Sequence, residues 1–191
     1  MTDLFEQRGF ETSYYEPGED SYLLATVCCD AISSDARVLD VGTGSGFVAD
    51  RIRERTGATV VGIDVNPHAC RKAHDRGVPV VQGDVVHPFR ENVFDIVVCN
   101  PPYLPTDPSE HRGDWLEVAL SGGASGREFV AALLEDVGRV LVPDGDLYLL
   151  VSSLMDVDAV ATLAIETGFT AEEIERDDSY PDEALFVYRL S

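Results

Sequence analysis

The sequence predicts one α/β domain built on a mostly parallel β-sheet with helices on both faces. Strand-like apolar runs and helix-like segments alternate along most of the chain, up to about Ser153, which is typical of parallel strands joined by crossover helices. Successive strands also end in glycine, aspartate or asparagine, and ligands of such sheets bind at the carboxyl ends of the strands. The length of 191 residues, 45% of them hydrophobic, suits a single domain over residues 1–191 that begins with a short extension, residues 1–14.

The charge of the chain is strongly negative. Acidic residues number 35 against 14 bases, the net charge is −21, and Lys72 is the only lysine. Two explanations are open: a surface adapted to a salt-rich cytoplasm, where screening weakens repulsion, or a basic partner. We favour the halophilic explanation. The charge also argues against nucleic acid as a substrate, because phosphate binding relies on clustered Lys and Arg, although overall acidity could conceal a local basic groove.

Neither membrane insertion nor metal binding is expected. No apolar run approaches the ~20 residues of a membrane helix, and the acidic N-terminus lacks the features of a signal peptide. We therefore expect a soluble, cytoplasmic protein. The four cysteines form no Cys-x-x-Cys pair, which argues against disulfides and a zinc site.

The first predicted helix follows Tyr15-Glu16-Pro17. Pro17 suits a helix start, and Glu19 and Asp20 suit its positive end. One helical face is expected to be apolar, and we interpret the helix as a lid. The residues assigned to that face are Tyr22, Leu23, Val27 and Ala31.

The first strand, residues 37–41, leads into Gly42-Thr43-Gly44-Ser45-Gly46 and then a helix to about Arg55. Glycines let the backbone turn tightly and approach a ligand closely. Asp40 lies two residues before the first glycine, where its carboxylate would repel a pyrophosphate but would suit the ammonium of a cofactor that carries an amino acid. The turn therefore favours S-adenosylmethionine over NAD.

Two further strands end in acids. Residues 59–63 end at Asp64, whose carboxylate can accept hydrogen bonds from both ribose hydroxyls of an adenosine. It is equally possible that Asp64 only caps the turn that follows the strand. Residues 78–82 lead into Gly83-Asp84-Val85. Asp84 can accept a hydrogen bond from the amino group of adenine, and the backbone N–H of Val85 can donate one to a ring nitrogen of adenine.

Chemistry is expected where the fourth strand ends. The segment from Ile96 to Pro105 begins with β-branched residues and changes abruptly at Asn100-Pro101-Pro102-Tyr103. Each proline holds the residue before it extended, so the corner presents two fixed acceptors, the Asn100 side-chain oxygen and the Pro101 carbonyl. These oxygens can accept both N–H bonds of a planar NH2 group, and Tyr103 can cover one face of it.

The rest of the chain completes the pattern. Residues 113–126 are expected to be a loop, with Trp115 as a wedge beneath it rather than a surface for stacking a substrate. A helix over residues 127–142 stops at Pro143-Asp144-Gly145, and residues 146–151 form the fifth strand. A helix over residues 155–167 and strands over residues 169–175 and 184–190 follow.

Together these motifs resemble the HemK/PrmC family of class I methyltransferases, which methylate the glutamine of the Gly-Gly-Gln motif in peptide-chain release factors. The resemblance extends over roughly Tyr14 to Leu190. Asn-Pro-Pro-Tyr alone also occurs in enzymes that methylate amino groups of DNA or RNA bases; the opening motif and residues 119–123 with Gly126 are more specific.

The resemblance implies a Rossmann-like sheet of seven strands, the last of them antiparallel, and S-adenosyl-L-methionine as cofactor. The residues that it implies as catalytic form the corner: Asn100, Pro101, Pro102 and Tyr103. The implied cofactor contacts are Tyr15, Pro17, Ser21, Asp40, Gly42, Thr43, Gly44, Gly46, Asp64, Val65, Asp84, Val85 and Asn100.

The resemblance also implies a partner. Bacterial members carry an N-terminal helical domain, whereas about 14 residues precede the opening motif here, as in the short archaeal and eukaryotic branch that works with a small zinc-binding activator. In the family's strand order the third strand lies at the sheet edge, and it is apolar for an edge. We therefore expect a heterodimer in which the activator pairs with the strand from Val78 to Gln82.

Three other functions remain open at this stage. A nucleic-acid methyltransferase acting on adenine or guanine amino groups would need a basic groove and a target-recognition insertion, and neither is visible. A protein-lysine methyltransferase could use the same corner after the ammonium loses its proton. The third possibility is a protein that binds the cofactor without catalysing a reaction, but such a protein would have no need of the two fixed hydrogen-bond acceptors at the corner.

Overall fold

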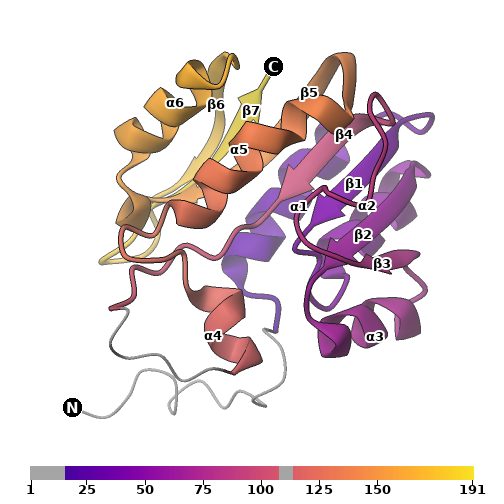
Figure 1. Cartoon of the computed structure of the whole chain (residues 1–191), viewed down its shortest axis with the longest axis horizontal. Helices are drawn as coiled ribbons and strands as arrows, with labels where there is room; N and C mark the ends of the chain where they lie inside the picture. The colour runs from indigo at the N-terminus through magenta and orange to yellow at the C-terminus, as the bar shows by residue number, and fades with distance from the viewer. Residues whose placement is uncertain (1–15, 108–113) are drawn as a thin grey trace.

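The computed structural model describes residues 16–107 and 114–191, so the predictions for Tyr14, Tyr15 and Gly113 lie outside the described residues. In the described part of the chain, seven strands form one sheet in the order β3-β2-β1-β4-β5-β7-β6, with helices on both faces (Figure 1). This arrangement confirms the predicted α/β fold. The strands are β1 (Arg37–Val41), β2 (Thr59–Asp64), β3 (Val80–Gln82), β4 (Phe94–Cys99), β5 (Leu141–Ser152), β6 (Ala171–Asp177) and β7 (Leu185–Leu190).

The direction of the strands also agrees with the prediction. Strands β1 to β5 run parallel to one another, whereas β7 is antiparallel to both β5 and β6. The last strand therefore lies between β5 and β6, and the carboxyl ends of β1 to β4 meet at one edge of the sheet.

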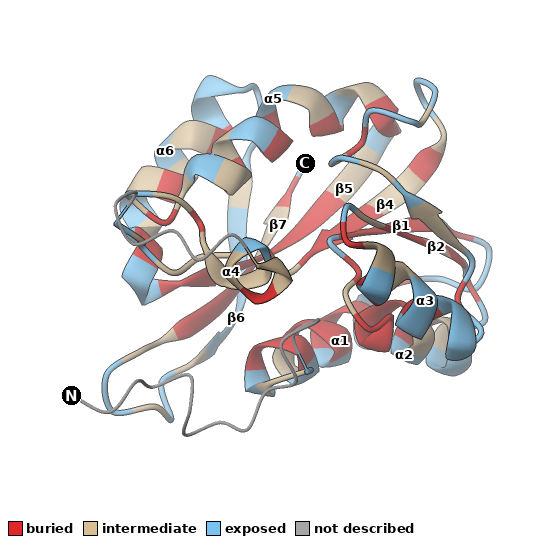
Figure 2. Cartoon of the chain, turned by 60° about the horizontal axis from the view of Figure 1, so that its bottom comes forward, coloured by how far each residue is buried: buried red, intermediate tan, exposed pale blue. Residues whose placement is uncertain are grey.

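Helices enclose two hydrophobic clusters, one on each face of the sheet. Val38 and Leu39 are neighbours on β1 but belong to opposite clusters, because side chains alternate across a strand. The buried strands lie between the two helical layers in Figure 2. The helices are α1 (Glu19–Ala31), α2 (Phe47–Thr56) and α3 (Pro67–Asp75) on one face, α5 (Glu128–Val140) and α6 (Val157–Glu166) on the other, with α4 (Trp115–Leu120) and the short 3-10 helix η3 (Ser153–Met155) beside the strand ends.

Helix α1 differs from the prediction in its buried face and in its role. Tyr22 is 51% exposed, whereas Leu24 and Cys28 are fully buried within the cluster that also contains α2. Tyr22 instead packs against Phe47 of α2, with ring centroids 4.6 Å apart and the rings tilted by 59°. Of the residues predicted for the apolar face, only Val27 is buried. Helix α1 is thus a core helix, and the interpretation as a lid was wrong.

Three segments also differ from the prediction. The expected loop before residue 126 contains helix α4, whose first turn is capped by Asp114 accepting from Glu117 N. Strand β3 begins at Val80 because Val78 is buried and donates its N–H to Ala73 O of α3 at 3.0 Å. Pro143-Asp144-Gly145 lies within β5, which already begins where α5 ends.

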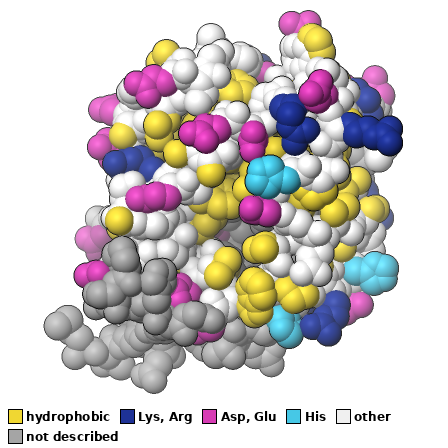
Figure 3. Space-filling model, in the orientation of Figure 1, with side chains coloured by type: hydrophobic (Ala, Val, Ile, Leu, Met, Phe, Trp, Pro, Cys, Tyr) yellow, Lys and Arg dark blue, Asp and Glu magenta, His cyan; other side chains and the backbone are white. Residues whose placement is uncertain are grey.

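The surface carries many carboxylates. Acidic side chains are spread over the face shown in Figure 3 rather than gathered in one patch. Across residues 16–107 and 114–191, no helix combines the length and apolar character needed to span a membrane.

Candidate active site

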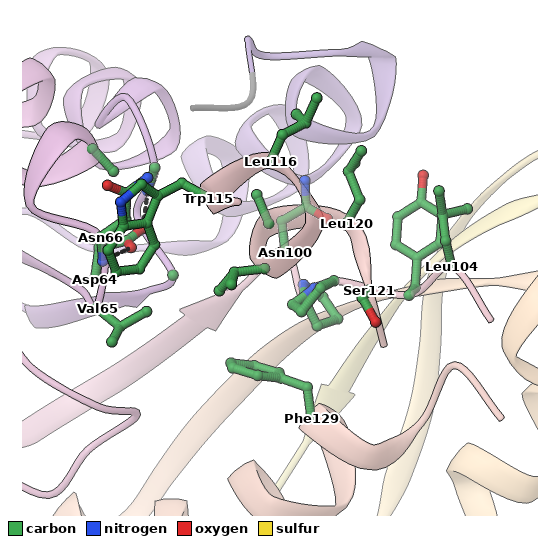
Figure 4. A pocket seen from close by; sticks show the side chains of 18 of the residues that line it. Asp64, Val65, Asn66, Asn100, Leu104, Trp115, Leu116, Leu120, Ser121 and Phe129 are labelled. Atoms are coloured by element: carbon green, nitrogen blue, oxygen red, sulfur yellow. Dashed lines mark hydrogen bonds between the residues drawn. The ribbon is translucent and has the colours of Figure 1, made fainter. Parts of the chain in front are cut away.

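A cavity of about 820 Å³ opens at the carboxyl ends of β1, β2 and β4. The N-terminal turn of α1, the glycine turn after β1 and helix α4 contribute to its walls (Figure 4). All predicted site residues inside the described part of the chain line this cavity except Gly46. The convergence follows from the sheet, because parallel strands place their carboxyl ends side by side.

The glycine turn shapes the floor of the cavity. Gly42, Gly44 and Gly46 have φ angles of +68°, +55° and +77°, which side chains rarely tolerate. A Cβ on Gly46 would lie 2.9 Å from Ala73 of α3, so this glycine permits close helix packing. A Cβ on Gly42 would meet no protein atom within 4 Å and would enter the cavity instead.

The side chain of Asp40 stabilises this turn through hydrogen bonds. The side chain is 2% exposed, and Oδ2 accepts from Thr43 Oγ1 at 2.7 Å and from Ala49 N at 3.2 Å. Burial raises the pKa of Asp40 to about 7, since desolvation disfavours the charged form. The structure thus gives Asp40 a structural role in the turn; its contact with a cofactor ammonium stays a prediction.

Asp64 joins the turns after β1 and β2. Its Oδ2 accepts from Gly44 N at 2.9 Å and its Oδ1 from Asn66 N at 2.8 Å. The capping alternative is therefore present in the structure. A carboxylate offers about four lone-pair sites, so these bonds leave room for the predicted ribose hydroxyls. Burial raises the pKa of Asp64.

Asp84 and Val85, the predicted adenine contacts, line the cavity. The Asp84 side chain is 69% exposed, and its Oδ2 lies 3.7 Å from Nδ1 of His87. Val85 has a φ of +45°, which is rare for a β-branched residue and marks an unusual backbone turn at a ligand-facing position. The adenine contacts of both residues remain predictions.

Asn100 occupies the end of β4. Its Nδ2 donates to Ser21 Oγ of α1 at 3.1 Å, whereas its Oδ1 is buried and has no hydrogen-bond partner in the structure. The buried Cys99 and Pro101 flank it on either side. A buried acceptor without a partner costs free energy, so this oxygen suits a donor that arrives with a ligand.

A second segment fixes the backbone beyond the corner. Leu104 N donates to Leu120 O at 2.9 Å, and Gly122 N donates to Leu104 O at 3.0 Å. Thr106 N also donates to Gly123 O at 2.9 Å. Residues 119–126 resemble the family in sequence, and these bonds give that resemblance a physical basis: the segment holds the corner in place.

Several walls of the cavity were not foreseen from the sequence. Asp20 is only 5% exposed and lines the cavity, although its position suggested only a helix N-terminus. Trp115 extends from α4 on the side of Asp64 and Asn66 (Figure 4) and lines the cavity, so the expectation of a wedge beneath a loop was wrong. Further unforeseen walls include Leu116, Phe129, Leu154, Asp182 and Glu183.

The cavity fits S-adenosylmethionine. The glycine turn leaves open space at Gly42, and carboxylates lie near the carboxyl ends of three neighbouring strands. Cationic and hydroxyl groups of the cofactor match these acceptors. Among the described residues, no group of three His, Cys, Asp or Glu side chains could hold a metal ion.

Comparisons with known proteins agree with this geometry. A family model described as "Methyltransferase domain" matches residues 39–103. A Methanocaldococcus jannaschii protein named for N5-glutamine methyltransferase activity is 31% identical over 182 residues, covering 91% of this chain and 89% of that protein. The methyltransferase HEMK2 of Homo sapiens is 34% identical over 158 residues, covering 74% of this chain and 73% of that protein.

A solved structure is also similar to this chain. The E. cuniculi Mtq2–Trm112 complex, described as responsible for methylation of the termination factor eRF1, superposes with a TM-score of 0.76 at 29% identity and covers 94% of this chain and 98% of that chain. The fold and site therefore define a class I methyltransferase that uses S-adenosylmethionine. The chain belongs to the HemK family of protein N5-glutamine methyltransferases.

Proposed function

We propose that this protein methylates the side-chain nitrogen of the glutamine in the Gly-Gly-Gln motif of a peptide-chain release factor. The observation that carries the proposal is the buried Asn100 Oδ1, which lacks a partner and lies beside the cavity. The family and the eRF1 methylation by the Mtq2–Trm112 complex support it.

The chemistry requires orientation more than activation. An amide nitrogen is a poor nucleophile because its lone pair is delocalised. When bound, S-adenosylmethionine supplies an electrophilic methyl group. Asn100 Oδ1 and the Pro101 carbonyl accept the two amide hydrogens and aim the nitrogen. Both hydrogen bonds strengthen as positive charge develops on the nitrogen, so they stabilise the transition state more than the ground state.

Tyr103 and the apolar walls exclude water from the amide. Tyr103 is half-buried and packs against both hydrophobic clusters, which gives its ring a fixed place beside the corner. Positioning of this kind can supply ~7 to 11 kcal/mol of the barrier reduction. No base is needed before transfer, because the nitrogen releases its proton after it has become positively charged.

Transfer of labelled methyl groups tests the proposal. We expect incorporation into purified release factor and none into a variant whose Gly-Gly-Gln glutamine is alanine. We also expect none into tRNA, DNA or a lysine-containing peptide. Asn100→Ala should lower kcat at least a hundredfold, consistent with the loss of a transition-state hydrogen bond. A kcat within threefold of the wild type would contradict the role of Asn100.

We further propose that a small zinc-binding activator pairs with the edge strand β3. Strand β3 has no charged residue, and Val80 and Val81 are half-buried, whereas β6 at the opposite edge carries charges along its length. Charges protect edge strands from pairing. The Mtq2–Trm112 complex supports a heterodimer of this kind.

Co-expression with an activator of the same source tests this interface. Val81→Asp should abolish co-purification, because a charge would be buried against the added strand. The matched control is Ile174→Asp on β6, which is 39% exposed at the other edge and should leave the complex intact. Zinc content is measured in the purified complex. The proposal would be contradicted if both variants co-purified with the activator to the same extent. It would also be contradicted if the protein were a stable monomer whose stability did not change when the activator was present.

We also propose that the acidity reflects work in a salt-rich cytoplasm. The carboxylates are spread over the face in Figure 3 rather than gathered for one basic partner, which supports this explanation.

A further inference from the structure

Ser21 and Asn100 meet across the site although 79 positions separate them in the chain. Asn100 Nδ2 donates to Ser21 Oγ at 3.1 Å. An asparagine amide has a donor end and an acceptor end, and a half-turn exchanges them. The contact with Ser21 therefore decides which end of the amide is left for another partner. In the structure the free end is the oxygen, Oδ1.

The residue before Ser21 holds the Ser21 backbone in place. Asp20 Oδ1 accepts from the backbone N–H of Ser21 at 2.6 Å, and Asp20 is almost fully buried. This bond fixes the backbone that carries the Ser21 hydroxyl. A hydroxyl can donate or accept, and in the structure the Ser21 hydroxyl accepts from Asn100 Nδ2.

Both partners are mounted on rigid elements. Ser21 lies in the first turn of α1, and Leu24 and Cys28 anchor that helix in the core without any exposure. Asn100 follows Cys99, which is fully buried on β4, and precedes a proline. Side chains held on packed elements keep their geometry better than those on loops.

We propose that Ser21 is a positioning residue, whose hydroxyl holds the Asn100 amide so that Oδ1 faces the substrate nitrogen. The inference rests on the proposed function. A turned amide would present its own N–H groups to the N–H groups of the glutamine, and two donors repel each other. Ser21 therefore acts on the rate through Asn100, whereas the sequence predicts it only as a cofactor contact.

Kinetics of paired variants test the role. Ser21→Ala should lower kcat about tenfold, in keeping with the loss of one hydrogen bond to a catalytic group, and Ser21→Thr, which keeps the hydroxyl, should restore most of it. The Kd of S-adenosylhomocysteine should stay within twofold of the wild type. In an Asn100→Ala background, Ser21→Ala should have no further effect, because its target is gone.

A different outcome would overturn the proposal. If Ser21→Ala weakened S-adenosylhomocysteine binding by the same factor as it lowered kcat, and did so equally in the Asn100→Ala background, Ser21 would be a cofactor ligand instead. Unchanged kcat in Ser21→Ala would equally exclude a positioning role. Thermal melting checks that each variant is folded, and Ser21→Cys replaces Ser21→Ala if the latter does not fold.

A measurement without substrate separates this inference from the proposed function. The side-chain NH2 signal of Asn100, assigned by its loss in Asn100→Ala, is followed by ¹⁵N NMR. We expect slow exchange of one amide proton in the wild type and in Ser21→Thr, and faster exchange with a shifted signal in Ser21→Ala. An unaltered signal in Ser21→Ala would overturn the inference even if release factor is methylated. The expected shift would uphold the contact even if another substrate is found.

Discussion

Gly126 lies so close to Tyr103 that a Cβ on the glycine would stand 2.6 Å from the tyrosine carbonyl oxygen. No non-bonded carbon and oxygen atoms approach so closely without displacement. Gly126 also has a φ of +77°. The segment that follows α4 is therefore in direct contact with the catalytic corner, and its glycine is required by that contact as well as by its backbone conformation.

Gly126→Ala should impair catalysis more than it impairs folding. The new methyl group displaces the Tyr103 backbone and the adjoining corner, so we expect kcat to fall at least tenfold. Gly168→Ala is the matched control, because Gly168 has a φ of +97° but no neighbour within 4 Å of a Cβ. That control should lose only about 1 kcal/mol of stability from the left-handed backbone. Equal kcat values in both variants would contradict the proposed contact.

Gly42→Ala should weaken cofactor binding. Its Cβ would meet no protein atom within 4 Å but would occupy part of the cavity, so the loss should appear in affinity. We expect the Kd of S-adenosylhomocysteine to rise more than tenfold by calorimetry. The stability loss should match that of Gly168→Ala, about 1 kcal/mol for a left-handed residue. An unchanged Kd would show that the cofactor lies elsewhere.

Much of the site could be predicted because its residues sit at strand ends. Once the alternation indicated a parallel sheet, Gly42, Asp64 and Asn100 had to meet at one edge. The structure brings them together around one cavity. The local signals were also strong, because a backbone with positive φ favours glycine and a corner fixed by proline can be recognised from the proline itself.

The remaining walls of the cavity had no such local signal. Phe129 and Glu183 come from α5 and from the segment before β7, and only tertiary packing places them beside the corner. The buried face of α1 was missed for a related reason. Leu24 and Cys28 are fully buried, whereas Tyr22 is half exposed and packs against α2, and the apolar pattern of the sequence does not reveal that choice.

The buried Asp40 should make stability depend on pH. Its pKa in the folded state, about 7, is above the usual value, so folding favours the protonated form and the contribution of Asp40 to stability falls as the pH rises toward 7. We expect Asp40→Asn to gain stability relative to the wild type between pH 5 and pH 8, measured by urea unfolding.

Asp95 supplies the control with the opposite sign. Its pKa is lowered to about 2, chiefly by its hydrogen bonds with Arg37, so its contribution is complete above the usual carboxyl pKa and is lost only in acid. The difference between Asp95→Asn and the wild type should stay constant from pH 5 to pH 8. A constant difference for Asp40→Asn as well would contradict the raised pKa.

Salt should stabilise the isolated protein if its acidity is an adaptation to a salt-rich cytoplasm. With a net charge of −21, mutual repulsion of carboxylates opposes the compact state. Screening shortens the range of that repulsion from about 10 Å at 0.1 M salt to about 3 Å at 1 M. We therefore expect Tm and methyl transfer to increase in KCl over this range, and a non-ionic osmolyte at equal osmolality to have a smaller effect. A Tm that falls in KCl, together with stabilisation by a basic partner at low salt, would instead support the alternative that the acidic surface serves binding.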